Sequence, residues 1–484
     1  MVNLKDILED VKYKNIINNN NNSIKGLSLD SRTCKEGYVF FAIEGASDDG
    51  NKYIKDAIDR GANVVVTSKL LDNYDSKTTY VIVENVASAV STFAKKFYDN
   101  PSSKINIIGV TGTNGKTTTA TLLYRLFKKL GYKCGLISTI RYIIDDEEIK
   151  AKHTTPDQIK LNELLSMMIQ KGCEYCFMEV SSHAMVQQRV EGIEFKIGIF
   201  TNITHDHLDY HGNFRNYIDA KKMFFDKLSV NSIAVINKDD KHSDYMVQNC
   251  KGKILSYSID RMSDYKGKII ENSIYGLKMM IDNKELDFLL TGRFNASNIM
   301  AVYVTAIQLH NDKDNVLREM TTLLPVEGRF DVVKSNFSNV ISIVDYAHTP
   351  DALEKLLQNI VELKVENSKI ITVFGCGGNR DKLKRPIMGS IAYNYSDIII
   401  ITSDNPRNED PESIIKDIAD GIKDRKKDVI MIPDRREAIK VATVMAKGND
   451  IIVVAGKGHE NYQEINGVRT EFDDKKILKE YLIK

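Results

Sequence analysis

The segment 105–119, INIIGVTGTNGKTTT, joins an apolar stretch to the start of a helix through a loop that contains glycine. Backbone N–H groups of such a loop point inward at phosphate oxygens, Lys116 supplies a positive charge, and the Thr117 hydroxyl is a ligand for Mg²⁺. The strict GxxxxGK[ST] pattern requires glycine where this chain has Val110, and the glycine falls at Gly112 instead. A glycine turn with an unrelated lysine is the alternative. The strand before the loop and the helix after it favour a phosphate-binding loop.

Acidic and imidazole side chains follow two further apolar stretches. The segment FMEVSSHAM carries Glu179, and TNITHDHLDYHG carries His205, His207 and His211. Parallel-sheet enzymes gather ligand groups at the carboxyl ends of strands, so Glu179 and His207 could both reach a Mg²⁺ ion near the phosphate loop. The alternative for each histidine is a loop or core imidazole with a satisfied hydrogen bond. Their clustering in polar segments favours a site.

The segment 217–228, YIDAKKMFFDKL, predicts an amphipathic helix with one anomalous residue. The residues of its apolar face are Tyr217, Ala220, Phe224, Phe225 and Leu228. Lys221 falls within this face, whereas Lys222, Asp219 and Asp226 lie on the opposite face. Because a buried, unpaired ammonium is costly, Lys221 either extends along the helix to water, pairs with an anion, or is chemically altered. A desolvated amine is more often neutral and can take up CO₂, which gives a carbamate whose anionic oxygen suits Mg²⁺.

Arg407 lies in TSDNPRNEDP, directly after the apolar run DIIIIT. The two prolines, Pro406 and Pro411, fix φ and exclude helix between them, so a rigid turn is predicted after the strand. The arginine is then either a solvated loop charge or a fork that grips a carboxylate.

The composition is that of an ordinary globular protein. The chain has 484 residues, a length typical of about three domains, with 42% hydrophobic and 27% charged residues. The net charge of +1 argues against nucleic acid or an anionic membrane as the main partner. No apolar run approaches the ~20 residues that span a bilayer, and the N-terminus MVNLKDILED lacks a secretory apolar core. We therefore expect a cytoplasmic protein without membrane insertion.

The six cysteines are scattered along the chain, without the density of a disulfide framework, which fits a reducing compartment. Cys173 and Cys176 do form a CxxC pair, but they lie in CEYCFMEV, a strand-like segment. No second pair with zinc-type spacing follows, so a zinc or redox site is not favoured there.

Strand-like and helical segments alternate along most of the chain. The polar tract 15–23 predicts a surface loop, and GYVFFAIEG and ANVVVTS predict strands of a small first domain that ends at the linker 98–106. The next strands, INIIGV, YCFMEV, IGIFTNI and SIAVIN, alternate with helices, which predicts a parallel sheet. After 323–333, a second alternation predicts a doubly wound domain with the strands VISIVDY, KIITVFG, DIIIITS, DVIMI and DIIVVAG.

The chain also carries the motifs GVTGTNGKTTT, MEVSSHAM, THDHLDYHG, YIDAKKMFF, TGRFNASN, EGRFD, VDYAHTPDAL, FGCGGNRDKLKRP, SDNPRNEDP and GKGHENYQ. In type and order these segments, from Asp30 to Glu460, resemble the Mur ligases. The resemblance implies an α/β fold of three domains. They are a small α/β UDP-substrate domain at 1–100, a central P-loop ATPase with a mostly parallel sheet at 101–325, and a Rossmann-like doubly wound domain at 326–484 that binds the amino acid. We expect a monomer.

The resemblance is closest to members that add meso-2,6-diaminopimelate, and it implies ATP-driven amide formation in peptidoglycan synthesis. The γ-carboxylate of D-Glu in UDP-N-acetylmuramoyl-L-Ala-D-Glu would attack the γ-phosphate of ATP, and the incoming amine would displace phosphate from the acyl phosphate. A carboxylate is a poor acyl donor at neutral pH, so phosphorylation is needed to create a leaving group. Lys116 and two Mg²⁺ ions would screen the charge between the reacting anions.

For ATP, the resemblance implies contacts from Gly112, Thr113, Asn114, Gly115, Lys116, Thr117, Thr118, Asn295, Arg329 and Asp345. Thr117 and Glu179 would hold one Mg²⁺ ion, and His207 with the carbamate of Lys221 would hold or order the second. Taken by itself, GRFNASN also predicts a helix start with an asparagine N-cap, which stays open for Asn298 and, less strongly, for Asn295.

The resemblance also assigns the two other substrates. The uridine-linked substrate would meet Ser31, Thr154, Thr155, Ser181, Gln187 and Arg189, with a plain turn hydroxyl as the alternative for Ser31. Diaminopimelate would meet Arg380, Asp404, Asn405, Pro406, Arg407, Gly456 and Glu460. It differs from lysine by a second carboxylate, which a bidentate arginine recognises, while Asp404 and Glu460 suit the distal ammonium. Asn379 stands where the family commonly has Asp, and it touches no proposed role.

Two other interpretations stay open. A non-catalytic ATP-dependent binding protein could reuse this scaffold, although the intact set Lys116, Glu179, His207 and Lys221 argues against it. A nearer rival is another ligase of the superfamily. A folylpolyglutamate synthase should lack the LDSR and HTTPD segments, and a lysine-adding relative should lack Arg407.

Overall fold

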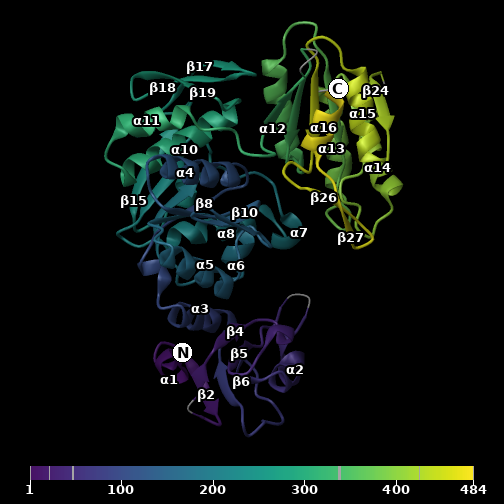
Figure 1. The fold of residues 1–484 in the computed structure, drawn as a ribbon. Coiled ribbons are helices and arrows are strands. Elements are labelled where there is room, and N and C mark those ends of the chain that lie inside the picture. Colours follow the sequence, from purple (N-terminus) through teal and green to yellow (C-terminus); the bar gives the residue numbers. More distant parts are fainter. Residues whose placement is uncertain (1, 21, 46–47, 336–338, 424–425, 483–484) are drawn as a thin grey trace.

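The computed structural model describes residues 2–20, 22–45, 48–335, 339–423 and 426–482. Three large sheets follow one another along the molecule, from the N-terminal unit through the central unit to the C-terminal unit (Figure 1). Among the described helices, none is long and apolar enough to cross a membrane. The predicted boundaries at 100/101 and 325/326 fall between these sheets, and we keep 1–100, 101–325 and 326–484 as proposed domain bounds.

The N-terminal sheet has the strand order β2-β7-β6-β5-β4, in which only β2 is antiparallel to its neighbour. Its strands are β2 (Tyr13–Ile17), β4 (Gly26–Ser28), β5 (Tyr38–Phe41), β6 (Ala62–Thr67) and β7 (Thr79–Val83). A short pair, β1 (Val2–Asn3) with β3 (Ser23–Ile24), and the helices α1 (Leu4–Leu8), α2 (Ile54–Asp59) and α3 (Val86–Phe97) complete the unit. The prediction of a loop over 15–23 is wrong at both ends, because β2 continues to Ile17 and β3 begins at Ser23.

The central sheet has the order β11-β10-β9-β12-β8-β13-β14-β15-β16 and is parallel from β9 to β16. Its strands are β8 (Asn106–Thr111), β9 (Cys134–Ile137), β10 (Arg141–Ile144), β11 (Glu147–Lys150), β12 (Tyr175–Glu179), β13 (Phe195–Phe200), β14 (Ile233–Asn237), β15 (Lys253–Ser258) and β16 (Tyr265–Lys266). The inner strands are mostly apolar, because helices cover both faces, and polar residues such as Glu179 occur at their ends. Cys173 and Cys176 are buried free thiols of this unit.

One face of this sheet packs against α4 (Lys116–Lys129), α10 (Arg293–Leu309) and α11 (Lys313–Thr321). The other face packs against α5 (Gln158–Gln170), α6 (Ser182–Val186) and α8 (Phe214–Asp226). The short helices α7 (Leu208–His211) and α9 (Ser243–Met246) contact α8, and a separate antiparallel sheet comprises β17 (Lys268–Ser273), β18 (Gly276–Ile281) and β19 (Lys284–Phe288). The strand β8, which carries the phosphate loop, therefore lies at the centre of the core.

The C-terminal sheet has the order β20-β21-β25-β22-β23-β24, with an antiparallel edge pair and parallel strands elsewhere. Its strands are β20 (Asp331–Lys334), β21 (Ile341–Asp345), β22 (Ile370–Phe374), β23 (Ile398–Ile401), β24 (Asp428–Met431) and β25 (Ile451–Ala455). One face packs against α12 (Pro350–Leu363), α13 (Lys384–Tyr395) and α14 (Pro411–Ala419), and the other against α15 (Arg435–Met445) and α16 (Asp474–Leu482). The hairpin β26 (Tyr462–Ile465) and β27 (Val468–Glu471) projects from this unit toward the centre of the molecule (Figure 1).

Candidate active site

The phosphate loop connects β8 to α4 in a turn that only glycine fits at two positions. Gly112 has a φ of +152° and Gly115 a φ of +86°, conformations that side chains with a Cβ rarely adopt. A Cβ at Gly112 would lie 1.9 Å from Thr201 Oγ1, and one at Gly115 would lie 2.5 Å from Asn298 Oδ1. Val110, where the strict pattern has glycine, lies inside β8 and is fully buried, so this departure leaves the turn itself unchanged.

Gly112→Ala is expected to weaken nucleotide binding about a hundredfold, since displacement of a site by about 1 Å can have an effect of this size. The added Cβ collides with Thr201 Oγ1, which donates to the Asn114 carbonyl oxygen at 2.6 Å and so holds the loop. Calorimetric titration with nucleotide measures the change.

Gly131→Ala is the matched control for this loop variant. Gly131 also has a positive φ, +92°, but no atom lies within 4 Å of its Cβ position. The substitution should lower the free energy of unfolding by about 1 kcal/mol and leave nucleotide affinity unchanged. Equal losses of affinity in both variants would show that backbone strain, and not the close contact with Thr201, decides the result.

Two lysine side chains converge on one backbone oxygen of the loop. The Gly112 carbonyl accepts from Lys116 Nζ at 2.8 Å and from Lys221 Nζ at 2.7 Å. Lys221 is 2% exposed, so the alternative that it extends to water is wrong. Burial lowers the pKa of both amines, and the charge of Lys116 lowers the pKa of Lys221 further. Two desolvated amines beside a phosphate loop are suited to receive an anion.

The neighbouring Lys222, predicted on the face opposite the apolar one, does not face solvent. Its side chain is also buried, with Nζ 2.6 Å from Asp226 Oδ1 and 5.6 Å from the centre of the Tyr245 ring. The helix α9, which carries Tyr245, packs against α8 and covers this face. The helical pattern separates the two lysines, but it does not show that both faces are covered.

Glu179 ends β12 beside the strand that carries the phosphate loop, and it is fully buried. Its Oε1 accepts from the Thr139 backbone N–H at 2.7 Å, whereas Oε2 has no hydrogen-bond partner among the described residues. An orphaned carboxylate oxygen and the nearby loop hydroxyl of Thr117 fit Mg²⁺, which takes few carboxylates together with water and phosphate oxygens. No group of three or more His, Cys, Asp or Glu in the described ranges could hold a metal by itself. The residues therefore fit an ion that shares its coordination with phosphate.

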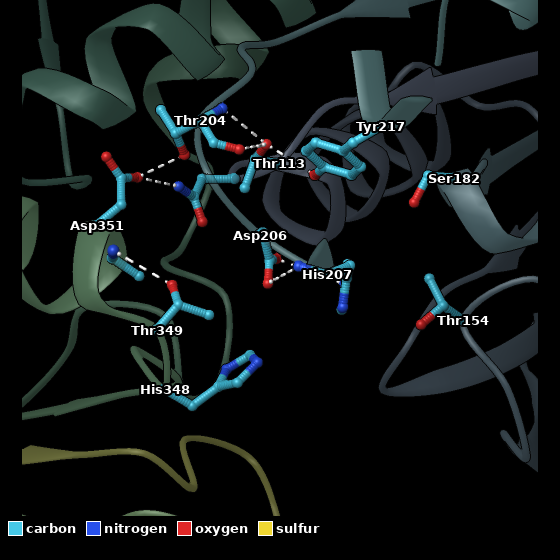
Figure 2. Close-up of polar contacts among 12 residues, drawn as sticks. Thr113, Thr154, Ser182, Thr204, Asp206, His207, Tyr217, His348, Thr349 and Asp351 are labelled. Carbon is cyan, nitrogen blue, oxygen red and sulfur yellow. Dashed lines mark hydrogen bonds and ion pairs between the residues drawn. The ribbon is translucent and has the colours of Figure 1, made fainter. Parts of the chain in front are cut away.

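His207 precedes α7 in a left-handed conformation with a φ of +53°. Its Nε2 lies 3.4 Å from Asp206 Oδ2, and its ring centre lies 4.8 Å from that of His183. Figure 2 shows Asp206 and His207 between Thr113 on one side and His348 of the C-terminal unit on the other. Burial lowers the pKa of His207 to about 4, so the imidazole is neutral at pH 7 and its free nitrogen can accept a hydrogen bond or bind a metal.

The remaining residues predicted to meet the nucleotide come from α10 and from the C-terminal unit. The asparagine N-cap interpretation of GRFNASN is wrong, because α10 begins at Arg293 after Gly292 and both asparagines are buried within it. Asn298 Nδ2 donates to Asn295 Oδ1 at 3.1 Å, which directs Asn298 toward the phosphate loop. Asn295 therefore orients Asn298, which lines the cleft, and does not itself line it.

Arg329 reaches from the C-terminal unit to the phosphate loop. Its Nη2 donates to Thr117 Oγ1 at 3.2 Å, and its guanidinium lies 4.5 Å from the centre of the Tyr346 ring. Asp345 accepts from the backbone N–H groups of Phe330 and Ala347 at 2.7 and 2.8 Å, and burial raises the pKa of its carboxyl. Asp345 therefore ties the segment of Arg329 to the end of β21.

The segment predicted to bind the uridine-linked substrate lies beside Glu179. Thr155 Oγ1 donates to the Glu179 carbonyl oxygen at 2.8 Å, and Arg189 Nη1 donates to the Thr155 carbonyl oxygen at 2.7 Å. Gln187 Oε1 accepts from Arg189 Nη2 at 2.6 Å, which orients the guanidinium. Ser31 belongs to the N-terminal unit, where it is buried in a short 3₁₀ turn.

A cleft of about 800 Å³ is lined by residues of both the central and the C-terminal unit. The predicted residues that line it are Thr113, Asn114, Gly115, Lys116, Thr117, Thr118, Thr154, Thr155, Glu179, Ser181, Arg189, His207, Lys221, Arg329, Asp345 and Arg380. The predicted residues outside its lining are Ser31, Gly112, Gln187, Asn295, Asp404, Asn405, Pro406, Arg407, Gly456 and Glu460. The structure thus brings together the nucleotide, metal and catalytic predictions, and it places most of the amino-acid pocket apart from them.

The Arg407 turn is held by the hairpin β26–β27. Arg407 has a φ of +53°, its backbone N–H donates to the Glu464 carbonyl oxygen at 3.0 Å, and its carbonyl accepts from Asn466 at 2.6 Å. Its Nη1 donates to the Gly378 carbonyl oxygen at 2.7 Å. A Cβ on Gly377 would lie 3.0 Å from this Nη1 and 3.8 Å from Arg380 Cγ, so the two arginines flank one glycine. The rigid turn fixes the guanidinium in place, which disfavours the solvated-loop alternative.

Lys457 is the residue of this pocket that the sequence analysis misses. It is fully buried, and its Nζ donates to Asn405 Oδ1 at 3.0 Å and Glu460 Oε2 at 3.3 Å and lies 3.6 Å from Asp404 Oδ1. The two carboxylates therefore already face one ammonium of the protein, in addition to the substrate ammonium predicted for them. The available signal is a lysine between two glycines directly after the buried strand β25.

Tyr217 and Asp351 are also missed as polar residues of the site. Tyr217, assigned to the apolar face of its helix, is fully buried with its hydroxyl 2.9 Å from Thr113 Oγ1. Asp351 lies within the VDYAHTPDAL motif, in which the sequence analysis assigns it no role, and contacts the phosphate loop from α12. Periodicity marks a side chain as buried but does not show which polar group its tip meets.

Three family models match the chain in sequence order. They are the Mur ligase family, catalytic domain, over residues 23–98, the Mur ligase middle domain over 110–306, and the Mur ligase, glutamate ligase domain, over 328–458. The UDP-N-acetylmuramoyl-L-alanyl-D-glutamate–2,6-diaminopimelate ligase of Cytophaga hutchinsonii is 50% identical over 482 residues, with 99% of each chain covered. That of Phocaeicola vulgatus is 48% identical over 478 residues, again with 99% of each chain covered.

Solved structures are similar over the same extent. A structure of a UDP-N-acetylmuramoyl-L-alanyl-D-glutamate–2,6-diaminopimelate ligase is 31% identical, covers 99% of this chain and 98% of its own, and has a TM-score of 0.68. The MurF ligase from Thermotoga maritima in complex with ADP shares the fold at 19% identity, with 94% and 96% covered and a TM-score of 0.63.

A phosphate loop whose cleft is completed by a second, Rossmann-like unit defines a phosphoryl-transfer enzyme that works between domains. Within that class, the family matches cover most of the chain, and relatives of about half identical sequence cover nearly all of it. The chain belongs to the Mur ligase family and is a ligase.

Proposed function

We propose that the chain joins meso-2,6-diaminopimelate to the γ-carboxylate of D-Glu in UDP-N-acetylmuramoyl-L-Ala-D-Glu, with conversion of ATP to ADP and phosphate, in peptidoglycan synthesis. The observation that carries the proposal is the cleft that joins the phosphate loop to Thr154, Thr155 and Arg189 on one side and to the C-terminal unit on the other. The names of the relatives support the choice of substrates. ADP in a MurF ligase of the same fold accords with the nucleotide.

The first step is phosphoryl transfer to the substrate carboxylate. A carboxylate oxygen forms a bond to the γ-phosphorus while the bond to the β,γ-bridging oxygen breaks, so that an acyl phosphate and ADP result. Lys116 and the N–H groups at the start of α4 hold the phosphates in line with the carboxylate, and Arg189 with Thr155 places the acceptor substrate. Arg329 adds positive charge beside Thr117, where charge develops on the transferred group.

Mg²⁺ would be held by Thr117 and Glu179, and a second ion by His207 and a carbamate on Lys221. When bound, the metal supplies a positive charge that offsets the charge of the phosphates. The buried Glu179 Oε2 and the neutral His207 provide the donors. Lys221 supplies the amine that could add CO₂, because burial holds its pKa well below the usual value and so leaves a larger fraction neutral.

The second step is attack by the amine of diaminopimelate on the acyl carbon, with loss of phosphate. The acceptor pocket is formed by Arg380, Asp404, Asn405, Pro406, Arg407, Gly456 and Glu460. Lys457 neutralises one of the two carboxylates, so Asp404 and Glu460 together keep one negative charge for a substrate ammonium. Arg407 would bind the carboxylate at the far end of the substrate.

We also propose a role for each of the three units, a cellular location and an oligomeric state. The unit at 1–100 binds the uridine moiety, with Ser31 as a contact, and the units at 101–325 and 326–484 bind ATP and the amino acid. The protein acts as a cytoplasmic monomer without nucleic acid or membrane insertion, which accords with its net charge of +1.

The test is phosphate release with UDP-N-acetylmuramoyl-L-Ala-D-Glu, ATP and Mg²⁺, in which meso-diaminopimelate is compared with L-lysine. Strong turnover is expected with diaminopimelate only, because lysine lacks the second carboxylate and would leave the Arg407 guanidinium unpaired on its substrate side. A preference for lysine would assign the chain to the lysine-adding relatives, and the absence of turnover with either amine would overturn the ligase assignment for these substrates.

A further inference from the structure

One carboxylate oxygen links the C-terminal unit to the phosphate loop. Asp351 Oδ2 accepts from Asn114 Nδ2 at 2.9 Å and from Thr204 Oγ1 at 2.8 Å. Figure 2 shows Asp351 reaching from α12 to Thr204, which lies beside Thr113. Both donors belong to the central unit, and Asp351 belongs to the C-terminal unit, so this contact joins the two units beside the cleft.

The two segments that carry the donors, the phosphate loop and residues 201–204, are hydrogen-bonded to each other. The Asn114 backbone N–H donates to Asn202 Oδ1 at 3.0 Å, and the Asn114 carbonyl accepts from Thr201 Oγ1 at 2.6 Å. The Thr204 N–H donates to Thr113 Oγ1 at 3.0 Å. Because the phosphate loop and the segment 201–204 are joined in this way, a force on Asp351 acts on the whole loop and not on one side chain.

Asp351 is equally well fixed on its own side. It lies in the first turn of the fourteen-residue helix α12, where the helix dipole favours a negative charge, and Thr349 caps the helix ahead of it. Lys355, one turn later, places Nζ 3.0 Å from Asp351 Oδ2. The helix dipole and Lys355 therefore both favour the charged carboxylate in this position.

Asp351 itself does not line the cleft, whereas Thr349 and Ala352 on either side of it do. The segment directly before α12 also places Asp345, Tyr346 and His348 in the cleft wall opposite the phosphate loop. Asp351 thus lies behind this wall and sets its distance from the loop, and its role does not require contact with the nucleotide.

We propose that Asp351 is a positioning residue that couples the placement of the C-terminal unit to the shape of the phosphate loop. The bonds to Asn114 and Thr204 hold the cleft wall at the separation that a bound nucleotide needs, so nucleotide binding and closure of the cleft favour each other. The proposal rests on the proposed use of ATP, although nucleotide binding tests it without any turnover.

The experiment measures affinity for a fluorescent ATP analogue on the full chain, and KM for ATP and kcat in the phosphate-release assay. Asp351→Ala is expected to lower affinity and raise KM about tenfold, the effect of losing a hydrogen bond to a charged group, with a smaller change in kcat. Asp351→Asn keeps an acceptor oxygen and should recover most of the affinity. The matched control is Glu354→Ala on the same helix, since Glu354 accepts from Tyr395 within the C-terminal unit and should leave affinity unchanged.

A double-mutant cycle with Thr204→Val separates coupling from local damage. If Asp351 acts through Thr204, the double variant should bind nucleotide no more weakly than Asp351→Ala alone. Additive losses, or wild-type affinity in Asp351→Ala, would overturn the proposal. If the wild type binds the analogue but releases no phosphate with any amine, the proposed function fails while the cycle still decides the role of Asp351.

Discussion

Lys221→Ala is expected to lower kcat about a thousandfold, within the range seen when one group that stabilises developing charge is removed. Its amine is buried 2.7 Å from the Gly112 carbonyl oxygen, beside the Lys116 amine. If CO₂ adds to the neutral amine, the product is an anionic carbamate and a proton. The variant would then lose a metal-binding oxygen as well as an amine.

Short carboxylates separate the two possibilities for Lys221. Acetate or formate could occupy the space left by the side chain and supply an anionic oxygen, so activity of Lys221→Ala should be partly restored as their concentration rises. A carbamate signal in ¹³C spectra of the wild type with labelled bicarbonate, absent from the variant, is the independent readout. If no concentration restores activity and no carbamate signal is seen, the carbamate hypothesis is contradicted and Lys221 acts as an unmodified lysine.

Lys222→Ala is the matched control for this experiment. Lys222 is the adjacent residue on the same helix and is also buried, but its ammonium pairs with Asp226 Oδ1 at 2.6 Å, away from the loop. It should lower the melting temperature without a comparable loss of kcat. Similar losses of kcat in both variants would indicate general damage to α8.

Arg407→Ala should lower kcat/KM for meso-diaminopimelate at least about a thousandfold, the order expected where a site is built around a polar group of its substrate. The Gly378 carbonyl engages Nη1, and the edge formed by Nε and Nη2 has the geometry of a carboxylate fork. Arg407→Lys should lose most of the activity too, because lysine keeps the charge but not the planar fork. Phosphate release at varied diaminopimelate concentration gives both constants.

Arg469→Ala is the control arginine for this pocket. Arg469 lies on β27 of the hairpin that supports the Arg407 turn, where it is 57% exposed and pairs with Glu464 at 2.9 Å. Its removal should change kcat/KM by less than about threefold, as is usual for an exposed ion pair. If Arg407→Ala keeps the preference for diaminopimelate over lysine, the turn is scaffolding and selectivity lies elsewhere in the pocket.

The structure also differs from the sequence analysis at specific residues, and each difference has a physical reason. GRFNASN contains asparagines at positions that suit an N-cap, yet α10 starts two residues before Asn295, after Gly292. Gly292 stands at the N-cap position, and both asparagines are buried within the helix, where Asn298 faces the phosphate loop. Lys222 is buried because α9 covers a face that helical periodicity alone assigns to solvent.

The sequence by itself determined the phosphate loop, the alternation of strands and helices, and the ends of the strands that carry Glu179, Asp345 and Arg407. These features depend on local rules, since glycine conformations, side-chain period and proline geometry act over a few residues. The same rules placed Lys221 on a buried face of its helix.

Only the tertiary structure decided which distant residues meet. Three contacts join segments far apart in the chain: Lys221 with the Gly112 carbonyl, Lys457 with Asp404, and Asp351 with Asn114. Such contacts depend on how sheets and helices pack in three dimensions. The identity of a lysine or aspartate in the sequence does not tell whether its charged group contacts water or another side chain. Burial and partners, which set charge and pKa, therefore come from packing.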